Sequence, residues 1–218
     1  IIVVNPEYVP SSLIISLLVN PNGYETSLFD ALDEYLPREN PVIEIGAGIG
    51  AVSAYVNDRL FIKTEHIALE PNPYYTELLR ETKKKNNLGT RFVQGAINYD
   101  TAFVPYVVSR NIVDTAAAAA YTDETVTVQS LTLSQIIRDS TFVDKTNITL
   151  IVDAEGVCED ILDNEPALSH AVSTIITTVT GSDEIFELRR KAESAGYTLV
   201  NTPLADESGL MTLVFQRT

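Results

Sequence analysis

The sequence predicts a three-layer, Rossmann-like α/β fold, with a mostly parallel sheet and one antiparallel strand near the C-terminus. Strand-like and helix-like segments alternate along most of the chain, which is typical of parallel strands joined by helices. The last two strand-like segments follow each other directly, which indicates a closing hairpin. The chain has 218 residues, 45% of them apolar and 21% charged, which suits one compact domain with a full core.

We expect residues 1–40 to form a helical or irregular extension packed on the core, and residues 41–218 to form the domain itself. Polar residues and a proline interrupt the apolar start of the chain, which argues against a signal peptide or a membrane-spanning helix. The single cysteine, Cys158, fits a reducing compartment. A cytoplasmic location is therefore expected.

The first half of the domain reads as strands and helices in turn. Apolar residues recur at helical spacing over residues 26–36, which predicts a helix. Asn72 and Pro73 predict the N-cap and first residue of a second helix, which should end within residues 86–89. Three apolar runs predict strands, at residues 42–45, 67–70 and 91–97.

The second half continues the alternation. A continuous β-branched run at residues 148–152 suits the centre of a sheet, and a helix should follow over residues 157–162. Ser182 predicts the cap of another helix, with acidic residues in its first turn and Gly196 at its end. The remaining strands are expected at residues 172–179, 197–201 and 210–216. In such sheets, ligands bind beyond the carboxyl ends of the strands, where the strand order reverses.

A glycine-rich turn follows the first strand of the domain, in the segment V-I-E-I-G-A-G-I-G-A. Gly46, Gly48 and Ala51 fit the dinucleotide pattern, whereas Glu44 with Gly46, Gly48 and Gly50 fits the pattern of methyltransferases. A carboxylate two residues before the glycines repels a pyrophosphate and suits a cation. Glu44 therefore favours S-adenosyl-L-methionine, which carries a sulfonium and an ammonium group, over a dinucleotide.

A second acidic residue, Glu70, ends the next strand and can accept hydrogen bonds from both ribose hydroxyls of an adenosine ligand. We expect Pro71 and Asn72, which follow it, to line the same site. After the third strand the chain carries Gln94, Gly95 and Ala96, and a side-chain or backbone amide there would contact the adenine.

With the glycine motif and Glu70 in place, the chain resembles class I S-adenosylmethionine-dependent methyltransferases. Three further segments are similar to the FkbM-type family within that class. They are L-I-V-D-A-E-G-V-C-E-D-I-L at residues 150–162, N-G-Y-E at residues 22–25 and S-L-T-L-S-Q-I-I at residues 130–137. The resemblance implies a methyltransferase sheet, S-adenosylhomocysteine as product, and Glu25 as a cofactor contact.

The chain departs from that family at two positions near the acceptor side. Cys158 stands where the family usually has a glutamate, and residues 175–180 read I-I-T-T-V-T where the family often ends its fifth strand with a glutamate. These departures bear on the identity of the methyl acceptor more than on the identity of the cofactor.

Asp153 and Glu155 follow the fourth strand and are the candidate catalytic residues. One carboxylate would orient the methionine amine, with Asp153 also a cofactor contact, and the other would accept the acceptor's proton. Which residue has which role stays open. His66 and His170 precede strands and so fall at the opposite edge of the sheet. No His pair or Cys cluster has metal-ligand spacing, so no metal is expected.

The chain has 15 basic and 30 acidic residues, a net charge of −15. Such a surface repels phosphate backbones and anionic lipids, so neither nucleic acid nor a membrane is expected as a partner. The leading hypothesis is O-methylation of a hydroxyl on a small molecule or a glycan. The alternatives are a nicotinamide-dependent oxidoreductase and an inactive nucleoside-binding module of the same fold. A homo-oligomer is left open.

Overall fold

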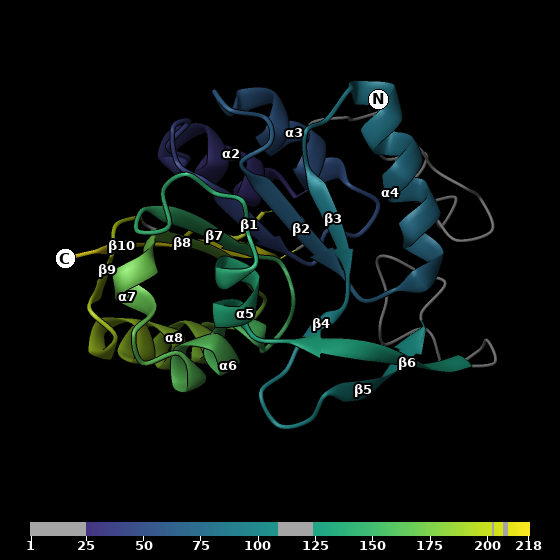
Figure 1. Cartoon of the computed structure of the whole chain (residues 1–218). Helices are drawn as coiled ribbons and strands as arrows, with labels where there is room; N and C mark the ends of the chain where they lie inside the picture. The colour runs from purple at the N-terminus through teal and green to yellow at the C-terminus, as the bar shows by residue number, and fades with distance from the viewer. Residues whose placement is uncertain (1–24, 109–123, 202, 207–208) are drawn as a thin grey trace.

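The computed structural model describes residues 25–108, 124–201, 203–206 and 209–218 (Figure 1). Most of the expected extension, residues 1–24, lies outside the described residues, and so do the first three residues of the N-G-Y-E segment. Within the described part of the chain, no helix is both long and apolar enough to cross a bilayer.

A seven-stranded sheet forms the centre of the molecule, in the order β3-β2-β1-β7-β8-β10-β9. Only β10 runs antiparallel to its neighbours β8 and β9. The order reverses between β1 and β7, because the chain first adds strands on one side of β1 and later on the other. The predicted fold class is confirmed. The strands are β1 (Val42–Ile45), β2 (His66–Glu70), β3 (Arg91–Gln94), β7 (Ile148–Val152), β8 (Val172–Val179), β9 (Tyr197–Leu199) and β10 (Met211–Arg217).

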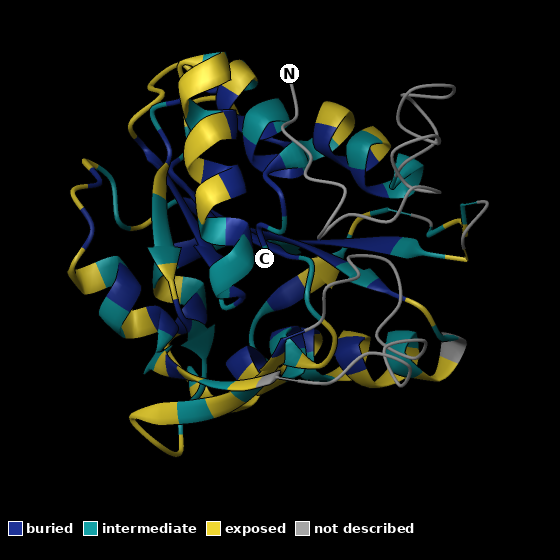
Figure 2. Cartoon of the chain, turned by 90° about the vertical axis from the view of Figure 1, so that its right-hand side faces the viewer, coloured by how far each residue is buried: buried dark blue, intermediate teal, exposed yellow. Residues whose placement is uncertain are grey.

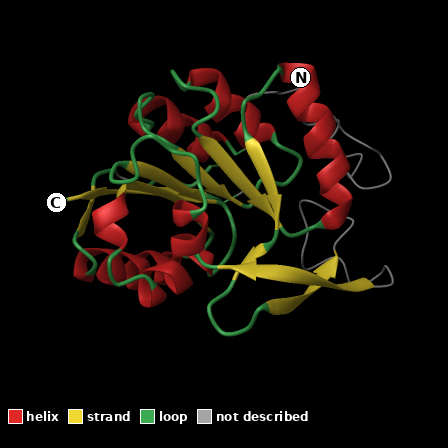
Figure 3. Ribbon diagram, in the orientation of Figure 1, coloured by secondary structure: helices red, strands yellow, loops and turns green. Residues whose placement is uncertain are grey.

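Helices cover both faces of this sheet, as Figure 3 shows. Three lie against one face: α2 (Thr26–Tyr35), α3 (Ala51–Arg59) and α4 (Pro73–Asn86). The other face is covered by α5 (Leu133–Arg138), α6 (Val157–Asn164) and α8 (Ser182–Ser194), with the short α7 (Leu168–Ala171) leading into β8. The layers agree with the alternation of strands and helices in the sequence.

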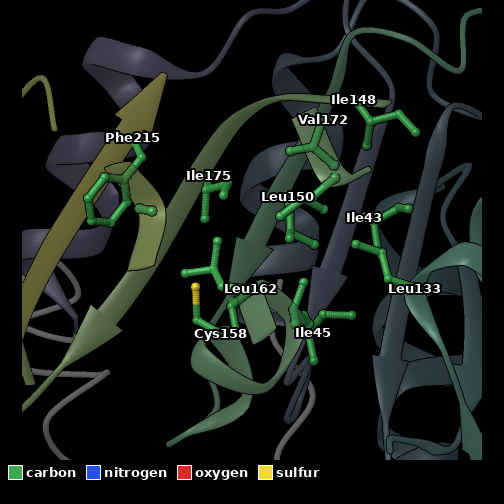
Figure 4. Packing of buried hydrophobic residues seen from close by; sticks show 14 of the residues in the cluster. Ile43, Ile45, Leu133, Ile148, Leu150, Cys158, Leu162, Val172, Ile175 and Phe215 are labelled. Carbon is green, nitrogen blue, oxygen red and sulfur yellow. The ribbon is translucent and has the colours of Figure 1, made fainter. Parts of the chain in front are cut away.

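The central strands are buried on both faces, which the burial colours of Figure 2 make visible. On β7, Leu150 packs on the side of α5 and α6, while its neighbour Ile151 packs on the side of α2 and α3, and both are fully buried. Figure 4 shows Leu150 between Ile43 of β1 and Ile175 of β8. Each such side chain contributes about 1.5–3 kcal/mol on burial, so the sheet supplies a rigid base for its loops.

The expected single strand over residues 91–97 is wrong, because the chain changes sheets at Gly95. β3 ends at Gln94, and β4 (Ala96–Ile97) pairs with β6 (Glu124–Leu131) in a separate three-stranded sheet of order β4-β6-β5. A Cβ on Gly95 would lie 3.0 Å from the carbonyl oxygen of Gln129, so glycine allows the close approach. Sequence analysis did not predict β6 or β5 (Phe103–Val108).

The helix ends follow local side-chain chemistry. Asn72 caps α4 as predicted, because its side chain accepts a hydrogen bond from the backbone N–H of Tyr74 at 3.0 Å. The predicted cap of α8 is one residue too late, since Gly181 is the N-cap. The Glu184 carboxylate accepts the backbone N–H groups of Thr180 and Gly181 there, so this helix start is held by a residue of its own first turn.

Candidate functional site

A cavity of about 500 Å³ lies beyond the carboxyl ends of β1, β2 and β7. It therefore lies at the reversal of strand order between β1 and β7, which is where open α/β sheets bind their ligands. The predicted site residues that line it are Glu25, Gly46, Gly48, Glu70, Pro71, Asn72, Gly95, Ala96, Asp153 and Glu155. Most of the residues singled out from the sequence thus lie around one cavity.

The glycine turn links the ends of three strands. Gly46 has φ +91°, and a Cβ there would lie 2.2 Å from the backbone oxygen of Asp153. The backbone N–H groups of Gly46 and Ala47 donate to the carbonyl of Leu69 at 3.0 and 2.9 Å. Gly48 has φ +52°, and a Cβ there would meet no atom within 4 Å. Gly46 therefore permits close backbone packing, whereas Gly48 borders open space.

Glu70 lies between the glycine turn and the start of α4. Its Oε2 accepts the backbone N–H of Gly48 at 2.8 Å, and its Oε1 accepts that of Asn72 at 2.7 Å. Burial raises the pKa of Glu70 to about 7, although both backbone hydrogen bonds oppose the shift. Each carboxylate oxygen has a second lone pair, so the two oxygens remain able to accept two hydroxyl groups from a ligand.

Asp153 and Glu155 occupy the same edge of the cavity in different surroundings. Thr178 Oγ1 on β8 donates to Asp153 Oδ1 at 2.7 Å. Burial raises the pKa of Asp153, and the Thr178 hydrogen bond opposes this. Glu155 is exposed at the rim. Asp153 is held in place in the cavity wall by Thr178, and Glu155 at the rim is exposed to a ligand that enters from solvent.

Glu44 does not line the cavity, so the structure does not place it beside the ligand as the sequence argument required. Its side chain is fully buried in a polar cluster (Glu44, Ser53, His66 and Thr90). Glu44 Oε2 accepts a hydrogen bond from Ser53 Oγ at 2.7 Å and lies 3.0 Å from His66 Nε2. His66 Nδ1 lies 2.9 Å from Thr90 Oγ1. The acid of the glycine motif thus joins β1 to β2 and α3.

Two other predicted cofactor contacts also lie outside this cavity. Gly50, with φ +85°, is the N-cap of α3, where a Cβ would lie 3.0 Å from Leu79 Cδ2. Gln94 is exposed and lines a neighbouring cleft. Gly50 allows α3 to pack on α4, and of the three residues expected near the adenine, Gly95 and Ala96 line the cavity whereas Gln94 does not.

Sequence analysis missed two tyrosines that line the cavity, Tyr75 of α4 and Tyr106 of β5. Burial, and next the charge of Glu70, raise the pKa of Tyr106 to about 12 and also raise the pKa of Tyr75. Both phenols therefore stay protonated near neutral pH. From the sequence, Tyr75 was interpreted only as part of the apolar face of a helix. Tyr106 lies on a strand that was not predicted.

The remaining candidates for chemistry lie away from the cavity. His66 is the first residue of β2 and is fully buried, and His170 belongs to α7, which precedes β8. Cys158 is buried in α6, and burial raises the pKa of its thiol to about 12, which makes it a poor nucleophile. No group of three or more His, Cys, Asp or Glu side chains in the described ranges is placed to hold a metal ion.

Comparison with solved structures identifies the fold. The precorrin-6y C5,15-methyltransferase of Geobacter metallireducens matches with a TM-score of 0.52 at 15% identity, over 86% of this chain and 85% of that one. A TehB-like SAM-dependent methyltransferase of Corynebacterium glutamicum matches with a TM-score of 0.52 at 13% identity, over 95% of this chain and 96% of that one. The 23S rRNA methyltransferase ErmE matches with a TM-score of 0.52 at 10% identity, over 89% of this chain and 68% of that one.

The chain therefore has the Rossmann-like fold of class I S-adenosylmethionine-dependent methyltransferases. No family model matches the sequence. No curated protein matches it either.

The expectation that excluded nucleic acid as a partner is wrong. It rested on the net charge of −15, but the fold is shared with an enzyme named for its action on 23S rRNA. A net charge averages over the whole surface, whereas a ligand meets the local field of one patch. The sum of charges is therefore no ground for excluding an RNA substrate.

Proposed function

We propose that this protein is a methyltransferase that uses S-adenosyl-L-methionine and releases S-adenosylhomocysteine. The observation that carries the proposal is the charge of the cavity. Four carboxylate residues line it, Glu25, Glu70, Asp153 and Glu155, and none of its described lining residues is a lysine or arginine. Such a lining attracts a sulfonium and an ammonium group and repels the pyrophosphate of a dinucleotide, which disfavours the oxidoreductase alternative.

The cavity also suits the neutral parts of the cofactor. Gly48 leaves open space beside the carboxylate of Glu70, so a ribose could approach the backbone and donate its hydroxyls to Glu70. Gly95 and Ala96 provide a wall without large side chains, against which a flat adenine could lie. These residues support nucleoside binding independently of Glu44.

When bound, the cofactor supplies a methyl carbon activated by a sulfonium and leaves as a neutral thioether. The chain's own residues have to align the acceptor, exclude water and remove a proton. We assign these tasks to Asp153 and Glu155: one carboxylate holds the ammonium group of the cofactor and the other accepts the proton of the acceptor hydroxyl. The Thr178 hydrogen bond fixes the orientation of Asp153 for either task.

The finer assignment remains part of the proposal. The FkbM-type resemblance of residues 150–162 implies transfer to oxygen, on a small molecule or a glycan. A hydroxyl acceptor fits a site whose candidate bases are carboxylates, because an alcohol must lose its proton during transfer.

Calorimetry with S-adenosylhomocysteine and NAD tests the cofactor assignment. We expect submillimolar binding of S-adenosylhomocysteine and no binding of NAD. Glu70→Ala should weaken nucleoside binding by about 1.5–3 kcal/mol for each charge-assisted hydrogen bond lost, whereas the exposed Glu193→Ala on α8 should not. Equal affinity of the Glu70→Ala and Glu193→Ala variants would show that Glu70 does not hold the ribose.

Paired variants separate the two carboxylates once an acceptor is found. Glu155→Gln should lower kcat by about 10²–10⁴ with little change in cofactor affinity if Glu155 is the base. If the loss falls on cofactor affinity instead, Glu155 holds the ammonium group and Asp153 is the base. Full activity in both Asp153→Asn and Glu155→Gln would contradict carboxylate catalysis. Cofactor binding without transfer to any hydroxyl compound would favour the inactive module.

A further inference from the structure

A second cleft, of about 320 Å³, adjoins the cofactor cavity at Glu70, which lines both. Its walls are the outer side of α4 and the edge strand β3. Three basic side chains line it, Arg80, Lys83 and Arg91, together with the ring of Phe92. The cofactor cavity, by contrast, is lined by carboxylates, so two adjoining hollows carry opposite charge.

This cleft is lined by part of a segment that is rich in positive charge. Residues 80–91 contain five of the chain's 15 basic residues, and only one acidic residue, Glu81. The rest of the chain is strongly acidic, since the whole carries a net charge of −15. The helix dipole favours Lys83, Lys84 and Lys85, because they lie in the last turn of α4. Arg80 and Arg91 lie outside that turn, so the dipole does not account for the two arginines of the cleft.

The cations around the cleft are available to a ligand. Arg80 pairs with Glu77 at 3.3 Å, but their side chains are 69% and 70% exposed, and such a surface pair holds its arginine weakly. Arg91 is exposed. Lys83 Nζ donates to the carbonyl of Thr90 at 2.7 Å, which anchors this ammonium on the wall and leaves it further N–H groups to donate.

The chemistry of the cleft fits phosphate. Arginine presents a planar fork of N–H donors that matches phosphate oxygens, and a fixed ammonium adds a point charge. Phe92 is only partly buried against Ala47, Ala68 and Leu79. Cations interleaved with a partly open aromatic ring are the pattern by which single-stranded nucleic acids are held.

We propose that this cleft binds a phosphate group of the methyl acceptor, which would place the acceptor's hydroxyl in the adjoining cavity. The inference rests on the proposed function, because it takes the adjoining cavity as the cofactor site. The phosphate comes from one of two sources, a single-stranded RNA or a small phosphorylated molecule. The two sources share the same recognition chemistry and differ in length and salt dependence.

The test compares two double variants that remove equal charge. Arg80→Gln with Arg91→Gln empties the cleft of its two arginines. Arg189→Gln with Arg190→Gln removes two exposed arginines of α8, each paired within its own helix as Arg80 is. Binding of a fluorescein-labelled single-stranded RNA of 12 nucleotides is measured by anisotropy at several salt concentrations. Binding of inorganic pyrophosphate is measured by calorimetry.

We expect the cleft variant to weaken binding of at least one probe by tenfold or more and the α8 variant to weaken it by less than twofold. For RNA, two lost phosphate contacts should also reduce the slope of log K against log salt by about 1.4. RNA binding identifies the polymer as the source, and pyrophosphate binding alone identifies a small phosphorylated acceptor. The proposal is overturned if neither probe binds, or if both double variants weaken binding equally.

Binding of S-adenosylhomocysteine separates this inference from the proposed function. It should be unchanged in both double variants, because neither arginine of the cleft lines the cofactor cavity. Tight cofactor binding with no phosphate binding would reject the cleft alone. Phosphate binding without cofactor binding would reject the assigned link between the two sites.

Discussion

Gly46 and Gly48 lie two residues apart in the glycine turn but face different surroundings. A methyl group on Gly46 would overlap the backbone of Asp153, which cannot move without breaking the sheet, whereas one on Gly48 would enter open space. Both residues have positive φ, which costs an alanine about 1–2 kcal/mol. Gly46→Ala should therefore lose about 3 kcal/mol or more of unfolding free energy, because overpacking adds to the backbone strain.

Urea unfolding of the two alanine variants checks this contrast. Gly48→Ala should lose only the backbone cost of about 1–2 kcal/mol, yet it should weaken binding of S-adenosylhomocysteine, because its methyl group would enter the open space that the ligand is proposed to fill. Equal destabilisation of the two variants would show that the close contact between Gly46 and Asp153 relaxes easily.

Glu70 should make stability depend on pH. Its pKa in the folded protein is about 7, above the ordinary value of 4.5, so the folded state holds this proton more tightly than the unfolded state does. The stabilisation is complete below pH 4.5 and is lost as pH rises through 7, with a total of about 3 kcal/mol. In urea unfolding between pH 5 and 8.5, the wild-type protein should lose more stability than Glu70→Gln does. If the unfolding free energies of the wild-type protein and Glu70→Gln change with pH in parallel, the titrating group is not Glu70.

The cavity residues that sequence analysis found share a simple origin. Glu70 and Asp153 directly end or follow buried strands, and a parallel sheet brings such ends together whatever the loops do. Glu44 does not line the cavity, because it lies inside its strand and its side chain contacts Ser53 of α3 and His66 of β2. The sequence shows that an acid is near a glycine turn but not to which side of the strand it points.

At the scale of elements, the additional β5–β6 pair is the part of the fold that sequence patterns did not reveal. Pro105 interrupts β5, and a proline inside a run argues against a strand. The structure accommodates it because, among the described residues, β5 pairs on only one side, with β6. The hairpin matters for the site, since it brings Tyr106 to a cavity otherwise built from the main sheet.

Tyr106 and Phe103 provide a matched test of this hairpin. They lie three residues apart on β5 and so on opposite faces, with Phe103 61% exposed and Tyr106 lining the cavity. Tyr106→Ser should weaken binding of S-adenosylhomocysteine or of the acceptor by about tenfold, which is the scale of one lost aromatic contact. Phe103→Ser should leave binding unchanged. If both variants have the same affinity for S-adenosylhomocysteine by calorimetry and the same KM for the acceptor, the β5–β6 pair does not contribute to the site.

For the whole molecule, the topology was predictable and the charge distribution was not. Right-handed βαβ connections put helices on both faces of a sheet only if the strand order reverses, so a cavity at a reversal could be expected. Its position between β1 and β7 comes from the structure. The net charge of −15 led to the wrong exclusion of nucleic acid, because a sum does not show that three basic residues line one cleft between α4 and β3.

The acidic surplus should make stability depend on salt. Mutual repulsion weakens when the screening length falls from about 30 Å at 0.01 M salt to about 8 Å at 0.15 M. We expect the melting temperature to rise by at least about 2–4 °C over this range, which corresponds to about 1 kcal/mol for a protein of this size. NaCl and KCl should act alike, as general screening requires. A melting temperature that stays constant or falls as salt is added would mean that local ion pairs outweigh the net repulsion.

The buried polar cluster of Glu44, Ser53, His66 and Thr90 also bears on how this protein could evolve. Glu44 Oε2 contacts both Ser53 and His66 away from water, while its Oε1 has no hydrogen-bond partner in the described part of the chain. Replacing Glu44 by an apolar residue therefore leaves Ser53 and His66 buried without that partner, at about 1–3 kcal/mol each. Homologues that carry an apolar residue in place of Glu44 should therefore have exchanged His66 as well. The acid of the glycine motif would then be retained because it joins two strands and a helix. Two proteins that share this acid would have the same packing in common, whether or not they bind the same ligand.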